Sequence, residues 1–179
     1  MRNTEAEPPA ARRTAREQPF DRLFLAEYGK VVAVAHRVLA DRSEAEDVAQ
    51  EVFLDFHRKQ RPDAAHASGW LYRAAVHRAL NRIRGRRRRE RRELADARGR
   101  EQRVVDPQHV VEVEEERRRV REALGRLPLK AASVLALRYS GLSYVEVGSA
   151  LGVGPGQVGT LLRRAEQALR KEMTSATPD

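Results

Sequence analysis

The last third of the chain specifies two short helices separated by a tight turn. The Ser143 hydroxyl can cap a helix, while the Glu146 carboxylate, three residues later, can accept a hydrogen bond from the Ser143 N–H, as in a capping box. Gly152 stands where a left-handed residue commonly ends a helix, and Pro155 suits the first position of the next helix. This pattern predicts a helix-turn-helix whose second helix can enter the major groove of DNA. A plain helical hairpin with a solvated basic face is the alternative.

The second helix of this pair, predicted from Pro155 to about Glu172, divides into a buried stripe and an outward face. Apolar residues at spacings of three and four form the stripe, namely Val158, Leu162, Ala165 and Leu169. Polar and basic residues lie outside the stripe, namely Gln157, Thr160, Arg163, Arg164, Arg170 and Lys171.

An excess of basic residues points to a polyanionic partner. Lys and Arg total 35 against 26 Asp and Glu, which gives a net charge of +9, and neutralising phosphates releases counterions that drive binding. An anionic membrane surface is the rival partner. No apolar run approaches the roughly 20 residues that span a bilayer, and residues 1–18 lack the apolar core of a signal peptide. We therefore expect a cytoplasmic protein without membrane insertion.

The chain lacks the residue patterns of catalysis and of metal binding. It has no cysteine, which excludes disulfides, thiolate catalysis and zinc sites built on thiolates. Its five histidines are scattered without a pair on one helical face, and no glycine-rich phosphate loop or nucleophile elbow occurs. We expect no catalytic residue, no metal, no cofactor and no enzyme activity.

Helical periodicity predicts an all-α fold of two small helical domains joined by a flexible linker. Aromatic residues make up only 5% of the chain, and alternating β-branched patterns are absent. Residues 1–19 are too polar to bury and are expected to be a disordered tail, and residues 174–179 a second tail. We predict one domain over 20–92, a linker over 93–112 where periodicity fades, and a second domain over 113–173.

A helix predicted over about 44–59 carries an apolar stripe and an acidic stripe. Ser43 is the expected N-cap, with Glu46 completing a capping box. The acidic stripe consists of Glu44, Asp47, Glu51 and Asp55, which recur at spacings of three, four and four and run beside Gln50. Because acids repel phosphate, the stripe predicts a protein partner with a basic surface rather than DNA. An ordinary solvated helix face is the alternative.

A loop from about Arg61 to Ser68 leads into a third helix that grows strongly basic toward its end. Trp70 opens the apolar stripe of this helix, which favours a core anchor over stacking on an unpaired base. The end of the helix carries a run of arginines, namely Arg82, Arg84, Arg86, Arg87, Arg88, Arg89, Arg91 and Arg92. Because arginines are so dense here, and because a second DNA-binding module follows, this run is expected to contact phosphates rather than to be only a solvated tail of the helix.

Three segments together resemble an extracytoplasmic-function (ECF) sigma factor of the sigma-70 family. They are Ala45–Leu54 (AEDVAQEVFL), Gly69–Ala75 (GWLYRAA) and Leu127–Tyr144, which begins Leu-Pro and ends Arg-Tyr-Ser-Gly-Leu-Ser-Tyr. Their order and separation also match, over about residues 20–172. The resemblance implies a protein that binds core RNA polymerase and directs promoter-specific transcription initiation through the −10 and −35 elements.

The resemblance also implies partners for the candidate residues. The acidic stripe would dock on the β′ clamp helices of core RNA polymerase, and the β subunit and promoter DNA would be further partners. Residues of the N-terminal domain would capture and open the −10 element, namely His66, Ser68, Trp70, Arg73, His77, Asn81 and Arg84. Residues of the helix-turn-helix domain would bind the −35 element, namely Arg138, Tyr144, Gln157, Thr160, Arg163 and Arg164. An anti-sigma factor is a partner that proteins of this family can have.

Four positions depart from the family's pattern. His77 and Asn81 stand where relatives often have Asn and Asp, and Gly159 and Leu161 stand where many carry Lys and Arg. Gly159 also weakens its helix by roughly 1 kcal/mol relative to alanine. The readout of the −35 element is therefore expected to rest on fewer side chains.

Two other functions fit parts of the sequence. An autonomous helix-turn-helix transcription regulator would use its N-terminal helices to dimerise or to bind a ligand, and an RNA-binding or nucleoid protein would use the arginine run without sequence preference. A dimer seam should be apolar at its centre, whereas the stripe at residues 44–55 is charged. If the linker lets the two domains move, the isolated chain should bind DNA weakly and largely without specificity.

Overall fold

The structure is a computed structural model that describes residues 9–97 and 110–175. The described chain forms seven α-helices, which confirms the predicted all-α class. The N-terminal set consists of α1 (Pro9–Leu39), α2 (Arg42–Lys59) and α3 (Ala67–Ala97). The C-terminal set consists of α4 (Val110–Arg126), α5 (Leu129–Tyr139), α6 (Tyr144–Leu151) and α7 (Pro155–Thr174). None of these helices is both long enough and apolar enough to cross a bilayer.

The first helix begins earlier than the sequence analysis predicted. α1 starts at Pro9, so the prediction of a disordered tail over 1–19 is wrong for residues 9–19, and residues 1–8 lie outside the described part. Proline is well suited to the first position of a helix. The segment that follows is rich in Ala, Arg, Glu and Gln, which are strong helix formers even where no apolar stripe is present.

The start of α2 also differs in its cap. The Asp41 carboxylate accepts a hydrogen bond from the Glu44 N–H at 2.8 Å, so Asp41 is the N-cap and the predicted capping box of Ser43 and Glu46 is wrong. Ala40 has a φ of 56°, which turns the chain sharply after α1 and places Asp41 in an extended conformation ahead of the first turn. Glu46 instead pairs with Arg42 at 2.8 Å on the surface.

The helix-turn-helix forms with its predicted caps. The Glu146 N–H donates to the Ser143 hydroxyl at 3.2 Å, and the Ser143 N–H donates to the Glu146 carboxylate at 2.8 Å, which completes the capping box. Gly152 ends α6 with a left-handed φ of 67°, and Pro155 opens α7. All three local signals are therefore confirmed.

Apolar stripes of α1, α2 and α3 form the core of the N-terminal domain. Fully buried residues include Val34 of α1, Val52 and Phe56 of α2, and Leu71 of α3. Trp70 is partly buried and packs edge-on against Phe56 with ring centroids 5.5 Å apart, as expected for a core anchor. The aromatic rings of Phe20, Phe24, Tyr28 and Phe53 close one end of this core.

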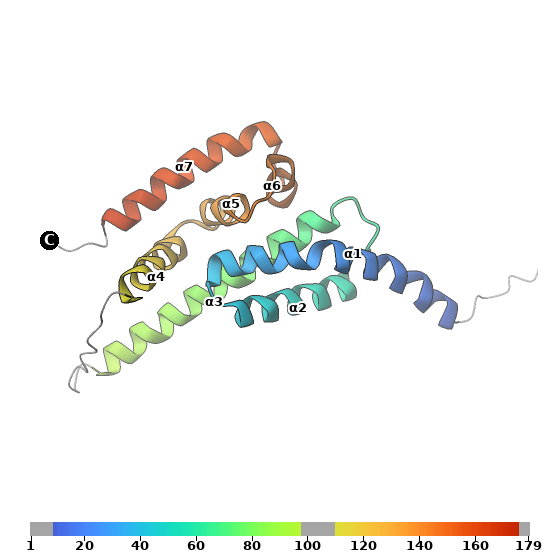
Figure 1. The fold of residues 1–179 in the computed structure, drawn as a ribbon, viewed down its shortest axis with the longest axis horizontal. Coiled ribbons are helices and arrows are strands. Elements are labelled where there is room, and N and C mark those ends of the chain that lie inside the picture. Colours follow the sequence, from blue (N-terminus) through green and yellow to red (C-terminus); the bar gives the residue numbers. More distant parts are fainter. Residues whose placement is uncertain (1–8, 98–109, 176–179) are drawn as a thin grey trace, which may run out of the picture.

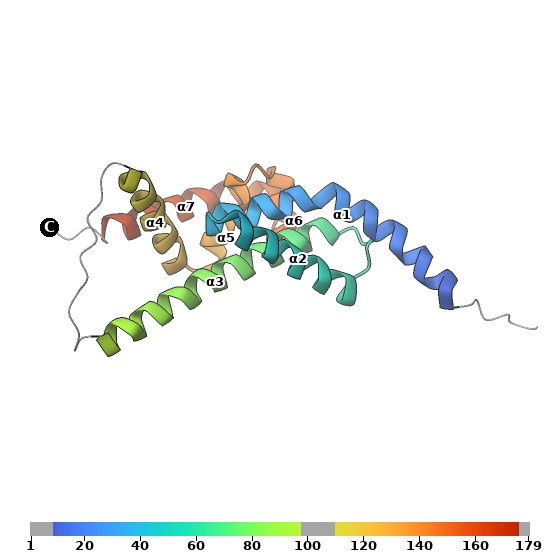
Figure 2. The same ribbon diagram turned by 60° about the horizontal axis from the view of Figure 1, so that its bottom comes forward.

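The C-terminal helices pack directly on the N-terminal ones. α3 contacts α4, α5 and α6, and α1 contacts α4 and α5, so that the buried residues of both domains join one continuous cluster. Figure 1 shows α4–α7 on one side of α1 and α3, with α2 on the other side. Figure 2 shows the end of α3 and the beginning of α1 projecting at opposite ends of the molecule. The two predicted helical domains are therefore present, and they pack against each other.

The predicted linker is shorter than expected. α3 continues to Ala97 and α4 already begins at Val110, so both ends of the predicted segment 93–112 are helical. Charged residues with good helix propensity extend α3 without needing an apolar stripe. Residues 98–109 lie outside the described part of the chain.

Candidate protein and nucleic-acid interfaces

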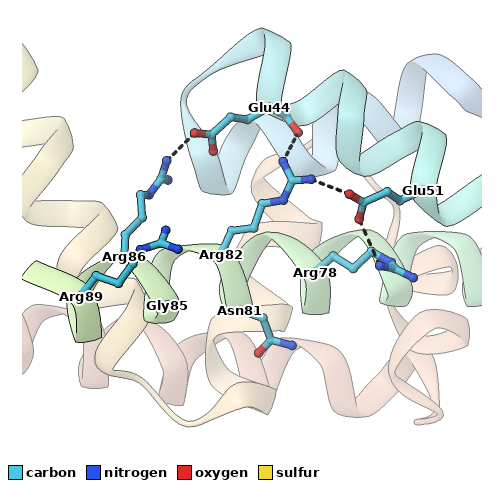
Figure 3. A pocket seen from close by; sticks show the side chains of 8 residues that line it. All are labelled: Glu44, Glu51, Arg78, Asn81, Arg82, Gly85, Arg86 and Arg89. Carbon is cyan, nitrogen blue, oxygen red and sulfur yellow. Dashed lines mark hydrogen bonds and ion pairs between the residues drawn. The ribbon is translucent and has the colours of Figure 1, made fainter.

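The acidic stripe of α2 is partly occupied by arginines of α3. Arg86 Nη1 lies 2.6 Å from Glu44 Oε1, and Arg82 Nη2 lies 2.8 Å from Glu51 Oε1. Arg78 reaches the other oxygen of Glu51 at 3.1 Å, and Arg82 also donates to the Glu44 carbonyl oxygen at 3.1 Å. Figure 3 shows these side chains meeting across the groove between the two helices. The three arginines repeat every four residues and therefore share one face of α3.

Asp55 belongs to the same network. It pairs with Arg78 across the helices and with Lys59 at 3.3 Å along α2. The hydrogen bond from Lys59, together with the positive charge of Arg78, holds the pKa of the Asp55 carboxyl below its ordinary value. Asp55 is therefore an ionised partner of α3 in the folded chain.

Asp47 and Gln50 form a separate outward face on α2. Both are exposed, and within the described part of the chain neither side chain makes a hydrogen bond or an ion pair. Leu54 lies one turn beyond Gln50 and is 57% exposed. The five predicted polymerase-binding residues thus divide into three that bind α3 and two that are available to another protein.

The beginning of α3 is held in place by α1. Ser68 Oγ donates to Glu27 Oε1 at 2.9 Å, and the Tyr72 hydroxyl donates to the other Glu27 oxygen. Burial and this carboxylate raise the pKa of the Tyr72 hydroxyl far above its ordinary value, which keeps it a donor. His66, just before the helix, is exposed and lies 3.4 Å from Gln60. Glu27 therefore fixes Ser68, one of the residues predicted for the −10 element.

Four other predicted −10 residues follow one another along α3. Arg73, His77, Asn81 and Arg84 recur at spacings of four, four and three, which places them on one face. Arg73 and Asn81 are exposed, while His77 and Arg84 are half-buried. Burial lowers the pKa of His77, and the charges of Arg73 and Arg84 lower it further. Figure 3 shows Asn81 on the side of α3 away from Glu44 and Glu51.

Arg84 is engaged with the C-terminal domain. Its Nε donates to the Gly125 carbonyl oxygen at 3.1 Å, and its Nη2 donates to the Leu127 carbonyl oxygen at 2.8 Å. These carbonyls lie at the C-terminal end of α4, where they have no partner within the helix and attract a cation. Arg87 donates to the Glu122 carbonyl oxygen of the same helix at 3.4 Å. The arginines further along the run, Arg88, Arg89, Arg91 and Arg92, are exposed.

The second helix of the helix-turn-helix presents its predicted polar face to solvent. The exposed residues of this face include Gln157, Thr160, Arg163 and Arg164, whereas Val158 and Ala165 are buried. Leu161 is partly buried and packs against the core. The leucine at this position therefore contributes to packing rather than to the polar face.

Arg138 and Tyr144 form one unit beside this helix. The Arg138 guanidinium carbon lies 5.6 Å from the centre of the Tyr144 ring, which is a cation–π distance. Arg138 Nη1 also donates to the Leu142 carbonyl oxygen at 3.2 Å. A Cβ atom at Gly159 would lie 3.6 Å from the Tyr144 ring, so this ring packs over the glycine. Arg138 and Tyr144, both predicted for the −35 element, thus lie next to α7.

Sequence reasoning missed several residues that organise these faces. Arg78 was not singled out, although its spacing from Arg82 and Arg86 matches the repeat of the acids on α2. Glu27 is flanked by apolar residues in α1, and a carboxylate in such surroundings is a signal for a buried donor. The contact of Lys30 with Glu146, at 2.9 Å between the two domains, had no signal in the local sequence.

The fold defines a class of all-α protein in which a three-helix domain is followed by a four-helix domain that contains a helix-turn-helix. Residues 23–89 match the family model for Sigma-70 region 2, and residues 117–169 match that for Sigma-70, region 4. The chain belongs to the ECF RNA polymerase sigma factors of the sigma-70 family.

Two relatives with curated descriptions support this assignment over most of the chain's length. It is 31% identical over 163 residues to the ECF RNA polymerase sigma factor SigW of Bacillus subtilis, covering 80% of this chain and 83% of the relative. It is 29% identical over 169 residues to the RNA polymerase sigma-H factor of Pseudomonas aeruginosa, covering 88% and 87%. The sigma factor RpoE from Bartonella quintana, solved in complex with the anti-sigma factor NepR, is similar with a TM-score of 0.48 and 20% identity, covering 88% of this chain and 98% of that one.

Membership in this family confirms the function that the sequence resemblance implied. The chain is a sigma factor that binds core RNA polymerase and directs promoter-specific transcription initiation. Sigma factors are regulatory initiation factors rather than enzymes.

Proposed function

We propose that α1–α3 form the unit that docks on polymerase and opens the −10 element, and that α4–α7 form the unit that binds the −35 element. In this proposal the chain works in the cytoplasm, where polymerase and chromosome meet. An anti-sigma factor is a further partner that we propose for it, because such factors regulate proteins of this family. The observation that carries the proposal is the division of the acidic stripe of α2 into an internal network and an exposed face.

The exposed face of α2 is the proposed contact with the β′ clamp helices. Asp47 and Gln50 retain their full capacity for ion pairs and hydrogen bonds with a basic partner, since they have none within the described chain. Leu54 adds an exposed apolar side chain to the same face, and apolar anchors surrounded by polar groups are typical of protein interfaces. Glu44, Glu51 and Asp55 contribute mainly by fixing α2 against α3, which sets the orientation of the docking face.

We assign the DNA contacts to two separate surfaces, one on α3 and the other on α7 with its neighbours Arg138 and Tyr144. Arg73, His77 and Asn81 lie on one face of α3, where they can meet the −10 strand, with Trp70 anchoring the start of the helix. The exposed side chains of α7 would enter the major groove at the −35 element, and Arg138 with Tyr144 would meet the adjacent phosphates. Because Gly159 carries no side chain, Thr160, Arg163 and Arg164 remain as the principal candidates for base contact.

Charge reversal at Asp47 tests the docking assignment with little effect on folding. Asp47→Lys places a positive charge opposite the proposed basic partner while leaving every ion pair of α2 intact, so affinity for core polymerase should fall at least tenfold. Asp21→Lys is the matched control, because Asp21 is also exposed on a helix and lies outside the proposed face. The measurement is titration of labelled chain with core polymerase, with helicity checked by circular dichroism. Unchanged affinity of Asp47→Lys would remove α2 from the interface.

A further inference from the structure

The arginines of α3 fall into two sets that differ in their partners. Arg78, Arg82 and Arg86 pair with carboxylates of α2, and Figure 3 shows these pairs together on one side of α3. A second set lines a cavity of about 420 Å³ together with Asn81, which Figure 3 shows on the other side of the helix. The arginines of this second set are Arg84, Arg87, Arg88 and Arg91.

The arginines that line this cavity have no carboxylate partner beside them. Arg84 and Arg87 are half-buried next to the end of α4, and both donate to backbone carbonyl oxygens there. Arg88 and Arg91 are exposed, and among the described residues neither side chain makes a hydrogen bond or an ion pair. No Asp or Glu is among the residues that line the cavity.

The cavity therefore collects four positive charges without a full negative charge in its lining. The carbonyl oxygens of α4 that two of the arginines contact offer only the partial charge of a helix end. Burial lowers the pKa of Arg87, and the positive charges of Arg126 and Arg91 lower it further. Glu122 and Glu90 act in the opposite direction, with smaller effects. A bound anion would relieve the repulsion among these guanidinium groups.

The chemistry of the lining points to linked phosphate groups. The planar guanidinium fork binds phosphate through two parallel hydrogen bonds, and Arg84 keeps free donors because its contacts with α4 use only two of its N–H groups. One phosphate group carries a charge of about −1.5 to −2 at pH 7, so two linked groups match the four arginines. The lining has no aromatic or aliphatic residue that could hold a base. Recognition would therefore rest on the phosphates alone.

The burial of the four arginines favours a compact anion over the backbone of a DNA duplex. A duplex is a stiff rod on this length scale, and it would reach the exposed Arg88 and Arg91. A compact anion that enters the cavity would also reach Arg84 and Arg87, which are half-buried beside α4. The volume of about 420 Å³ falls within the range of about 300–1,000 Å³ that is usual for small-molecule sites.

We propose that the cavity lined by Arg84, Arg87, Arg88 and Arg91 binds a compact polyphosphate, an anion in which two or more phosphate groups are linked. Binding itself is a property of the free chain and does not depend on the promoter contacts proposed above. Its consequence does rest on them. Because Asn81 belongs both to the cavity and to the face proposed for the −10 element, a bound polyphosphate would compete with the −10 strand.

Calorimetric titration of the full chain with inorganic tripolyphosphate, without divalent cations, tests the proposal. One ligand should bind per chain, and Arg88→Gln with Arg91→Gln should weaken binding at least tenfold. Both residues are exposed, and glutamine is nearly as good a helix former as arginine, so the fold should be retained. The matched control is Arg22→Gln with Arg89→Gln, which removes the same charge at exposed positions outside this cavity. The control should bind nearly as well as the unmodified chain.

Three results would overturn the proposal. If tripolyphosphate does not bind, or binds both double variants equally, the cavity is not a polyphosphate site. If inorganic monophosphate binds as tightly as tripolyphosphate, linked phosphate groups are not what the cavity recognises. If the Arg88→Gln, Arg91→Gln variant keeps its affinity for tripolyphosphate but binds a short DNA duplex more weakly than the control does, these arginines bind DNA instead. Circular dichroism confirms that each variant is folded.

Discussion

Replacing Gly148 with alanine should destabilise the helix-turn-helix, although alanine is the better helix former. The turn folds back on α6 at this glycine, where a new Cβ would lie 2.8 Å from the Val153 carbonyl oxygen and 3.4 Å from the Pro155 nitrogen. The Val153 N–H also donates to the Gly148 carbonyl oxygen at 3.0 Å, which holds the turn in this position. The obstructing atoms belong to the backbone, so the turn itself must move.

The expected size of the effect follows from two opposing terms. Overpacking of this kind costs about 2–3 kcal/mol when backbone must shift, and the gain in helix propensity from Gly to Ala is about 1 kcal/mol. Gly148→Ala should therefore lower the free energy of unfolding by about 1–2 kcal/mol. Gly29→Ala is the control, because a Cβ at Gly29 of α1 meets nothing within 4 Å, and this change should raise stability by about 0.5–1 kcal/mol.

Urea unfolding followed by circular dichroism measures both variants. The two midpoints should move in opposite directions from that of the unmodified chain, with unchanged dependence on denaturant. If Gly148→Ala stabilises the chain as much as Gly29→Ala does, the close approach of the turn to α6 is not present in solution, and the reasoning is refuted.

Three further predictions follow from single side chains. Ser133→Ala should raise the free energy of unfolding by about 1 kcal/mol, because the buried Ser133 hydroxyl of α5 has no hydrogen-bond partner in the described structure. The melting temperature should rise accordingly. The hydrogen bond from Lys30 and that from the Ser143 N–H lower the pKa of Glu146 from 4.5 to about 2. The stability that Glu146 contributes is therefore present above pH 4.5 and lost as the pH falls toward 2, and acid titration of Glu146→Gln should lack this component. Arg164→Ala should weaken −35-dependent initiation by about 1–3 kcal/mol if Arg164 binds a base in bidentate fashion. Arg170→Ala is the control. If the Arg164→Ala variant is as active as the unmodified chain on every promoter tested, Arg164 is not part of the site.

Local sequence signals correctly predicted where the helices of the helix-turn-helix begin and end. The capping box of Ser143 and Glu146, the left-handed Gly152 and the initial Pro155 each act within a few residues, and the structure confirms all three. Two other local predictions were wrong, at the start of α1 and at the cap of α2. In both cases a second residue satisfied the same requirement, since Pro9 can open a helix and Asp41 can cap one.

Contacts between distant segments could not be predicted from periodicity alone. The spacing of the acids on α2 predicted that they share a face. It did not predict that arginines of α3 would bind three of the four acids, because a helical repeat does not show which neighbour that face meets. The seam between the domains depends on Gly69 and Gly125, whose role appears only when α6 and Ile83 are brought against them. The assignments of individual residues to the −10 and −35 elements stay predictions.

Footprinting on promoter DNA at physiological salt tests most directly whether the chain recognises promoters only as part of the polymerase. The free chain should protect no defined site, while the chain with core polymerase should protect both the −35 and the −10 elements. If the chain alone protects a defined site as well as the complex does, it acts as an autonomous helix-turn-helix regulator, and promoter recognition through polymerase is contradicted.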